Sequence, residues 1–209
     1  MTCRVVTIAR STGAEADRIG PAVATQLGYR FVDEEILALA AQRAGLTRQI
    51  IEDQERSHSL VAQVLSAMSA VLASAPEVQL PKQDAWDDPS SAYRRLIQNV
   101  IEETAAQGHV VIAAHGAGIH LAGTAGLLRV LLTASPATRV RRLAAAAGLD
   151  DASARRQIVY SDRERRAYLA RFDKVRDELP THYDLVINTD VLPPAIAVQV
   201  IVGAASAMD

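Results

Sequence analysis

The chain has 209 residues, of which 49% are apolar and 22% are charged, and its formal net charge is −2. This size suits one globular domain, and the balanced charge argues against a disordered chain and a general nucleic-acid-binding surface. The single cysteine, Cys3, excludes a disulfide-rich secreted scaffold and favours a cytoplasmic protein. No run reaches the roughly 18 uncharged apolar residues of a membrane span, so no membrane association is expected.

Short β-branched or leucine-rich runs alternate with longer helical patterns along the chain. Four such runs, at residues 5–9, 110–114, 128–133 and 185–188, do not alternate polar with apolar positions. Continuous apolar runs of this length are typical of a parallel sheet that is buried on both faces. The sequence therefore predicts an α/β fold with three layers, in a single domain over residues 1–209.

Three helices between these runs have recognisable ends. A helix over residues 17–27 stops at Gly28, and a helical pattern that starts at residue 88 runs to Gly108. Glycine is favoured at such ends because it adopts the left-handed conformation without strain. A further helix over residues 33–45 begins with Asp33 as its N-cap.

Residues 47–75 carry apolar side chains at helical spacing, which predicts a long amphipathic helix. Its stripe consists of Val61, Val64, Leu65, Met68, Val71 and Leu72. Two interpretations stay open, because the stripe can cover the protein's own sheet or form the contact of a homodimer. The segment 75–89, with three prolines and several acids, is typical of a surface loop.

The turn after the first run, "RSTGAEAD", lies where a phosphate-binding loop would lie, between a strand and a helix N-terminus. The full signature of such a loop, GxxxxGK followed by Ser or Thr, is absent. Gly13 remains, but two acids, Glu15 and Asp17, stand where a triphosphate would be held. Either these acids repel a polyphosphate, or they stabilise the first helical turn, with Asp17 as its cap.

Six segments in this order resemble the cytidylate kinase-like family of P-loop proteins over nearly the whole chain. They are "VVTIARSTG", "LGYRFVDEEILALAAQRAGL", "GHVVIAAHGAGIHL", "LLRVLLTASPATRVRRLAAAAGL", "DRERRAYL" and "HYDLVINTD". The resemblance implies a nucleoside monophosphate kinase-like fold of about five parallel strands, with a helical insertion at about 47–107 and a lid at about 150–176. It also implies phosphoryl transfer from ATP, with Mg²⁺, to a nucleoside monophosphate such as CMP.

The same resemblance assigns roles to residues around the first turn. Arg10 and Gly13 are expected at the phosphates, and Arg18 is the only nearby candidate to replace the family's basic residue there. Asp33 and His115 are expected at the acceptor.

The chain departs from the family at both places. Two later glycines of the family's loop are Glu15 and Ala16 here, and the family's basic residue is Asp17. The family's Gly-Arg-Gly-Ala-Asp is "AHGAG" here, so His115 replaces an arginine and lacks its bidentate fork.

Residues 139–176 form a basic stretch, with 11 of the chain's 22 Lys and Arg residues against 5 acids. Asp162, Arg163 and Arg166 match the family's lid helix, in which arginines neutralise charge on the transferring phosphates. Arg139 and Arg142 lie one turn apart on the preceding helix and could add to this field. The alternative is a solvated helix face in which Asp162 pairs with Arg166.

Two functional hypotheses follow from these observations. The first is a kinase-like enzyme that binds a nucleotide or another phosphorylated small molecule, with weak phosphoryl transfer. The second is an inactive kinase-like protein that acts by ligand sensing or protein–protein interaction. No nucleic-acid-binding module and no metal-ligand spacing is recognised, so neither nucleic acid nor a protein-held metal is expected.

Overall fold

A computed structural model of the protein describes residues 2–33, 36, 89–113 and 116–208. The chain divides into two compact units, Met1–Asp33 with Thr104–Asp209, and Glu34–Glu103. Helix α5 (Pro89–Gln107) belongs mainly to the second unit and ends before Gly108, which has the predicted left-handed conformation with φ 68°. The helix predicted over residues 47–75, with its proposed homodimer contact, lies outside the described residues.

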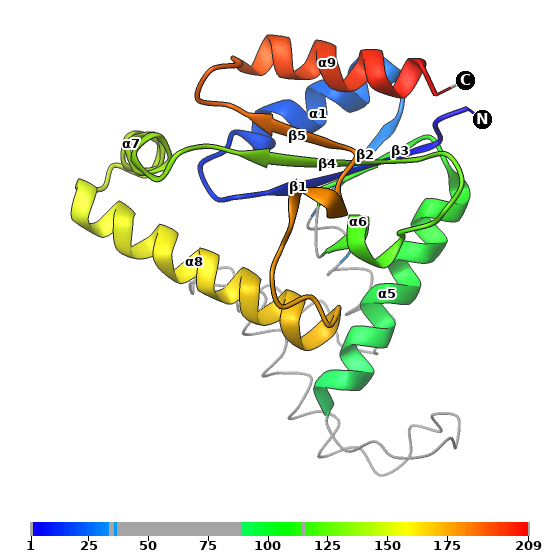
Figure 1. Cartoon of the computed structure of the whole chain (residues 1–209), viewed down its shortest axis with the longest axis horizontal. Coiled ribbons are helices and arrows are strands. Elements are labelled where there is room, and N and C mark those ends of the chain that lie inside the picture. Colours follow the sequence, from blue (N-terminus) through cyan, green and yellow to red (C-terminus); the bar gives the residue numbers. More distant parts are fainter. Residues whose placement is uncertain (1, 34–35, 37–88, 114–115, 209) are drawn as a thin grey trace, which may run out of the picture. The chain divides into compact units, whose positions relative to one another are not determined.

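The first unit is built on one parallel sheet with the strand order β2-β3-β1-β4-β5 (Figure 1). The strands are β1 (Val5–Arg10), β2 (Arg30–Val32), β3 (Val110–Ile112), β4 (Leu127–Thr133) and β5 (Leu185–Asn188). The α/β class and the four predicted strands are confirmed. The fifth strand, β2, lies at the sheet edge and has only three residues, of which Val32 alone is buried, so it leaves no apolar run to recognise.

Helices α1 (Ala16–Leu27) and α9 (Pro194–Ser206) cover one face of the sheet (Figure 1). The buried cluster beneath them takes alternate residues from the two central strands, together with apolar side chains of both helices. Its main members are Val6, Ile8, Ile19, Val23, Leu128, Val130, Leu132, Val198 and Ile201. Each such side chain stabilises the fold by about 1.5–3 kcal/mol when fully buried. Helix α1 ends at Gly28, as predicted, with φ 67°.

The opposite face of β1 and β4 contacts the short helix α6 (Ala117–His120). Thr7 lies between Val6 and Ile8 on β1 and therefore points to this face. Its side chain is 2% exposed, and its hydroxyl has no hydrogen-bond partner among the described residues. A Cβ atom at Gly118 would lie 2.7 Å from Thr7 Oγ1. This close approach leaves no room for a side chain at Gly118 unless Thr7 moves.

Helices α7 (Pro136–Ala147) and α8 (Asp151–Phe172) pack against each other through Val140, Ala154 and Ile158. Each begins with a side-chain cap, because Ser135 Oγ accepts from the Thr138 amide and Asp150 accepts from the Ser153 amide. Helix α8 forms most of the segment predicted as the lid. None of the helices in the described part of the chain is long and apolar enough to span a membrane.

A buried polar cluster that the sequence analysis did not identify fixes the end of α8. The Arg165 guanidinium donates two hydrogen bonds to the carboxylate of Glu178, which also accepts one from the Tyr183 hydroxyl. Burial alone would raise the pKa of Glu178, but hydrogen bonds and charge from Arg165 outweigh it and hold that pKa below its usual value. Burial, and then the contact with Glu178, raises the pKa of Tyr183.

Alanine at Gly118 is expected to lower the free energy of unfolding by about 1–3 kcal/mol, because its Cβ would overpack against Thr7 Oγ1. The same change in a Thr7→Ala background should cost less, since the clashing atom is gone. Urea unfolding of the four proteins in this double-mutant cycle measures the difference. Equal costs in the two backgrounds would contradict the close contact.

Glu178→Gln is expected to lower the free energy of unfolding at pH 7 by about 2 kcal/mol, because it removes a part-buried, charge-assisted pair. A depressed pKa in the folded state stabilises the protein above the unfolded-state pKa, about 4.3, and this contribution is lost as the pH falls through the folded-state pKa. The wild-type protein should therefore lose its advantage over the variant on acidification, as measured by urea unfolding at several pH values. Glu164→Gln, on the exposed face of α8, is the control and should change neither quantity.

Candidate functional site

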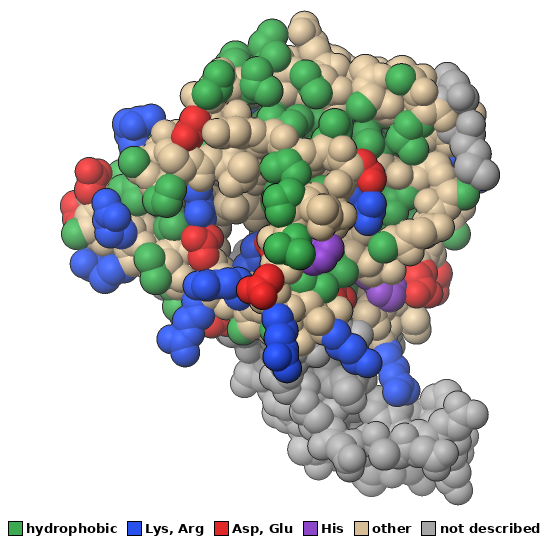
Figure 2. Space-filling view, viewed as in Figure 1, with side chains coloured by type: hydrophobic (Ala, Val, Ile, Leu, Met, Phe, Trp, Pro, Cys, Tyr) green, Lys and Arg blue, Asp and Glu red, His purple; other side chains and the backbone are tan. Residues whose placement is uncertain are grey.

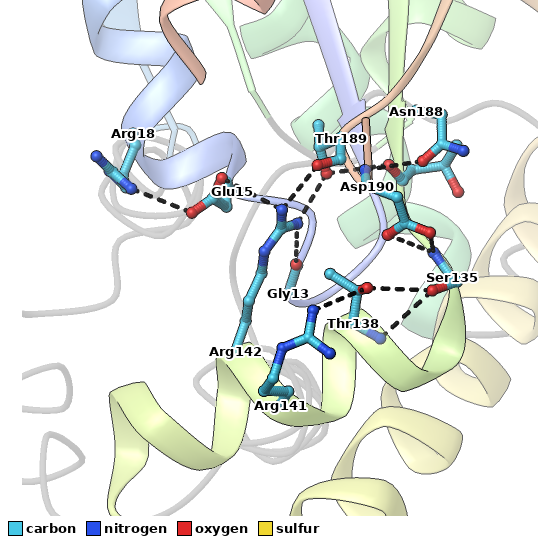
Figure 3. Close-up of polar contacts among 11 residues, drawn as sticks. Gly13, Glu15, Arg18, Ser135, Thr138, Arg141, Arg142, Asn188, Thr189 and Asp190 are labelled. Carbon is cyan, nitrogen blue, oxygen red and sulfur yellow. Dashed lines mark hydrogen bonds and ion pairs between the residues drawn. The ribbon is translucent and has the colours of Figure 1, made fainter. Parts of the chain in front are cut away.

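The candidate site lies at the carboxyl edge of the sheet, where open parallel sheets bind their ligands. Three segments meet there: the loop 11–15 after β1, the start of α7 after β4, and the turn 189–190 after β5 (Figure 3). The central strand β1 has β3 on one side and β4 on the other, so its loop lies between the ends of its neighbours. This arrangement brings together the predicted phosphate loop and the basic segment of the chain.

The loop keeps the backbone shape of an anion-binding turn. Gly13 and Glu15 both have the left-handed conformation, with φ 82° and 62°. The amides of Ser11 and Ala14 donate to carbonyl oxygens of Leu132 and Ser11. No hydrogen bond joins the amides of Thr12, Gly13, Glu15 and Ala16 to a described residue, so these donors can meet an anion.

The proposed capping role of Asp17 is wrong. Helix α1 begins at Ala16, so Glu15 holds the N-cap position and Asp17 is an exposed residue of the first turn. Glu15 makes no side-chain cap hydrogen bond either. Its left-handed conformation costs about 1–2 kcal/mol for a residue other than glycine. Glu15 therefore occupies a backbone position that suits the glycine found there in the family.

The carboxylate of Glu15 pairs with two arginines. Oε1 lies 3.1 Å from Arg18 Nη1 and Oε2 lies 3.6 Å from Arg142 Nη2. The Glu15 side chain is only 18% exposed, whereas that of Arg18 is 67% exposed. The acid at the loop is thus compensated by the protein itself, and Arg18, which we expected at the phosphates, contacts this acid.

Arg142 links the loop to the turn after β5 (Figure 3). Its Nη1 donates to Gly13 O at 3.3 Å and to Thr189 Oγ1 at 2.9 Å. Its Nη2 donates to Thr189 O at 2.7 Å. Because both segments are held by one guanidinium, their spacing is fixed by a side chain of α7.

The turn after β5 also caps α7. Both carboxylate oxygens of Asp190 accept from the Ser135 amide, at 3.1 and 3.0 Å, while the Asp190 amide donates to Asn188 Oδ1 at 2.9 Å. The hydrogen bond from Ser135 holds the pKa of Asp190 below its usual value. The structure shows that Thr189, which is buried, also anchors Arg142.

Arg139 joins the loop to α8. Its side chain is 7% exposed, its Nε donates to Thr12 O at 2.7 Å, and its two terminal nitrogens donate to the Asp162 carboxylate at 3.0 and 2.6 Å. The hydroxyls of Thr12 and Ser161 are 2.6 Å apart. A Cβ atom at Gly13 would lie 2.9 Å from Arg139 O, so glycine is needed here for close packing as well as for its conformation. Loop, α7 and α8 form one connected unit.

The alternative side-chain pair between Asp162 and Arg166 is wrong, because the Asp162 carboxylate binds Arg139. Arg166 Nε donates instead to the Asp162 carbonyl oxygen at 3.3 Å. Arg163 and Arg166 both lie on the exposed side of α8. Cationic side chains gather over this helix and the segment after it (Figure 2), namely Arg155, Arg156, Arg163, Arg166, Lys174 and Arg176.

Arg10 and Asp33, which we expected at the phosphates and at the acceptor respectively, form an ion pair with Nη1 and Oδ2 2.7 Å apart. Arg10 ends β1 and Asp33 follows β2, and β3 lies between these strands, so the pair crosses the end of β3. The other acceptor candidate, His115, lies outside the described residues, as does all but residue 36 of the helix predicted to follow Asp33.

The residues of the loop fit a Mg²⁺-polyphosphate only in part. The open amides and the left-handed turn suit an anion, but the loop has no lysine and Glu15 brings a negative charge into it. Within the described ranges, no group of three or more His, Cys, Asp or Glu side chains is arranged to hold a metal ion.

Comparison with known proteins shows which family the chain belongs to. The model of the cytidylate kinase-like family matches residues 5–191. Among solved structures, an uncharacterized protein from Eubacterium ventriosum is 13% identical with a TM-score of 0.67, and the match covers 97% of this chain and 98% of that one. Shikimate kinase from Bacteroides thetaiotaomicron is 17% identical with a TM-score of 0.53, covering 96% and 97%. Shikimate kinase from Acinetobacter baumannii is 14% identical with a TM-score of 0.50, covering 97% and 93%.

No curated protein sequence matches the chain. The structural likenesses are too low in identity to show more than a shared fold, whereas the family match spans most of the chain. With its five parallel strands and the loop between β1 and α1, the chain belongs to the cytidylate kinase-like family.

Proposed function

We propose that the protein binds a phosphorylated nucleotide at the loop 11–15 and transfers a phosphoryl group to a nucleoside monophosphate such as CMP only weakly. Family and fold support a function of the nucleotide kinase type. The observation that carries the weak-transfer part is the conformation of Glu15: the loop has kept the left-handed turn and the open amides but has placed a carboxylate among them.

The predicted site residues are proposed in the following roles. Arg10, Gly13 and Arg18 serve the phosphates, where Gly13 lets the loop backbone approach closely, while Asp33 and His115 serve the acceptor. Arg163 and Arg166 on α8 neutralise charge that develops on the transferring group. Asp162 acts as a positioning residue, because its carboxylate holds Arg139 against the loop.

ATP with Mg²⁺ would supply the phosphoryl group in this proposal. The partial fit of the loop to a polyphosphate is the reason that the transfer is proposed to be slow. Arg163 and Arg166 on α8 favour a small anionic ligand, and the lone, buried Cys3 is in keeping with a cytoplasmic protein.

The second candidate is a kinase-like protein that senses a ligand or binds a partner without catalysis. It is favoured by the contacts of Arg139 and Arg142, which were expected to add to the field at the phosphates. Both guanidiniums donate to the chain's own carbonyl oxygens and carboxylates. Cations held in this way contribute less to a developing charge than cations that turn toward it.

Millimolar Mg²⁺-ATP, CTP or CMP is expected to raise the melting temperature, because a ligand that binds only the folded state stabilises it by mass action. A concentration of 100 times the dissociation constant adds about 2.7 kcal/mol to the free energy of unfolding. Differential scanning fluorimetry at several ligand concentrations measures the shift, with adenosine as the control without phosphate. An unchanged melting temperature with all three nucleotides would reject nucleotide binding.

Arg163→Gln and Arg166→Gln are each expected to reduce ATP-to-CMP phosphoryl transfer about tenfold or more, since each removes a cation from the transferring group. Formation of CDP with time measures the transfer. Arg155→Gln, on an exposed part of the same helix, is the matched control and should leave the rate unchanged. Absence of CDP with the wild-type protein, although nucleotide binds, would favour the second candidate.

A further inference from the structure

We propose that Glu15 competes with a polyphosphate for Arg142. Its carboxylate pairs with the guanidinium that a polyphosphate bound at the loop would need. This inference rests on the proposed function, since it concerns the same loop. In this proposal Glu15 sets the affinity of the site for a polyphosphate, because its carboxylate keeps Arg142 from the ligand. A polyphosphate then binds by exchanging places with Glu15 at that guanidinium.

The geometry around Arg142 supports this exchange. The same guanidinium donates to Gly13 O at 3.3 Å and lies 3.6 Å from Glu15 Oε2, so its charge lies beside the loop that carries the open amides (Figure 3). A carboxylate and a phosphate oxygen are both acceptors that a guanidinium binds in the same manner. While Glu15 is paired with Arg142, part of the positive charge beside the loop is already offset.

The backbone conformation of Glu15 also supports the proposal. A left-handed conformation is disfavoured for glutamate and is easy for glycine, so conformational preference does not explain this residue. What the glutamate adds is its pair of contacts with Arg18 and Arg142, on a side chain that is largely buried. The carboxylate is thus held at the loop and does not extend into solvent.

Asp17 provides an internal comparison. It lies two residues further on, it is exposed, and it forms no ion pair with a described residue. If negative charge near the loop were all that mattered, Asp17 and Glu15 would weaken anion binding to a similar extent. If the pairing with Arg142 matters, Glu15 alone has a large effect.

The test uses inorganic tripolyphosphate, which has no base or sugar, and isothermal titration calorimetry of the full chain. Glu15→Gln, which keeps the size of the side chain, is expected to bind tripolyphosphate at least tenfold more tightly than the wild-type protein. Glu15→Gly, which also relaxes the backbone, should gain at least as much. Asp17→Asn is the matched control and should change the affinity less than twofold. Thermal unfolding of each variant verifies that it is folded.

The outcomes separate this inference from the proposed function. Unchanged tripolyphosphate affinity in both Glu15 variants overturns the inference, even if the wild-type protein binds nucleotides. An equal gain in Asp17→Asn also overturns it, because general charge would then be the cause. A gain confined to the Glu15 variants supports it. That gain, with no nucleotide binding by any of the proteins, would leave the inference standing and reject the proposed function.

Discussion

The guanidinium of Arg142 holds together three segments that are far apart in the sequence. From its place on α7, it donates to the carbonyl oxygen of Gly13 in the loop after β1 and to two oxygens of Thr189 after β5. Backbone carbonyls at the carboxyl ends of strands need donors once the sheet ends, and a planar group with five N–H donors can serve several of them at once. The loop is held at one end by strand β1 and at Gly13 by this contact, so its shape depends on Arg142.

Arg139, one turn away, has a comparable role on the side of α8. Its bidentate contact with Asp162 and its hydrogen bond to Thr12 O bring the predicted lid helix against the loop. Arg139 and Arg142 of α7 thus connect the loop to the elements around it. This use of arginine is economical because a guanidinium stays charged, and its rigid fork fits carbonyl and carboxylate acceptors equally well.

The kinship of the chain and the chemistry of its loop give different information. The family match gives the kinship, and the five parallel strands place the loop after β1 at the carboxyl edge of the sheet, the edge at which open parallel sheets bind their ligands. They do not show how strongly a phosphate is held there. Affinity depends on the side chains, and here Glu15 meets Arg18 and Arg142 where the family has a glycine. A left-handed backbone turn with open amides and a paired carboxylate therefore coexist in the same loop.

The sequence alone determined the fold class and most of the sheet, because strands buried on both faces require continuous apolar runs and these runs are visible at β1, β3, β4 and β5. It also determined the helix ends at Gly28 and Gly108, where only local backbone preference is involved. Strand β2 was not recognised, since three residues at a sheet edge owe their structure to a neighbouring strand. Only the tertiary structure decided the partners of the arginines, because Arg139 with Asp162 and Arg142 with Glu15 and Thr189 pair across long sequence separations. Charge and spacing along the chain indicate which residues can pair, but the packing of α7 against the loop selects which of them do.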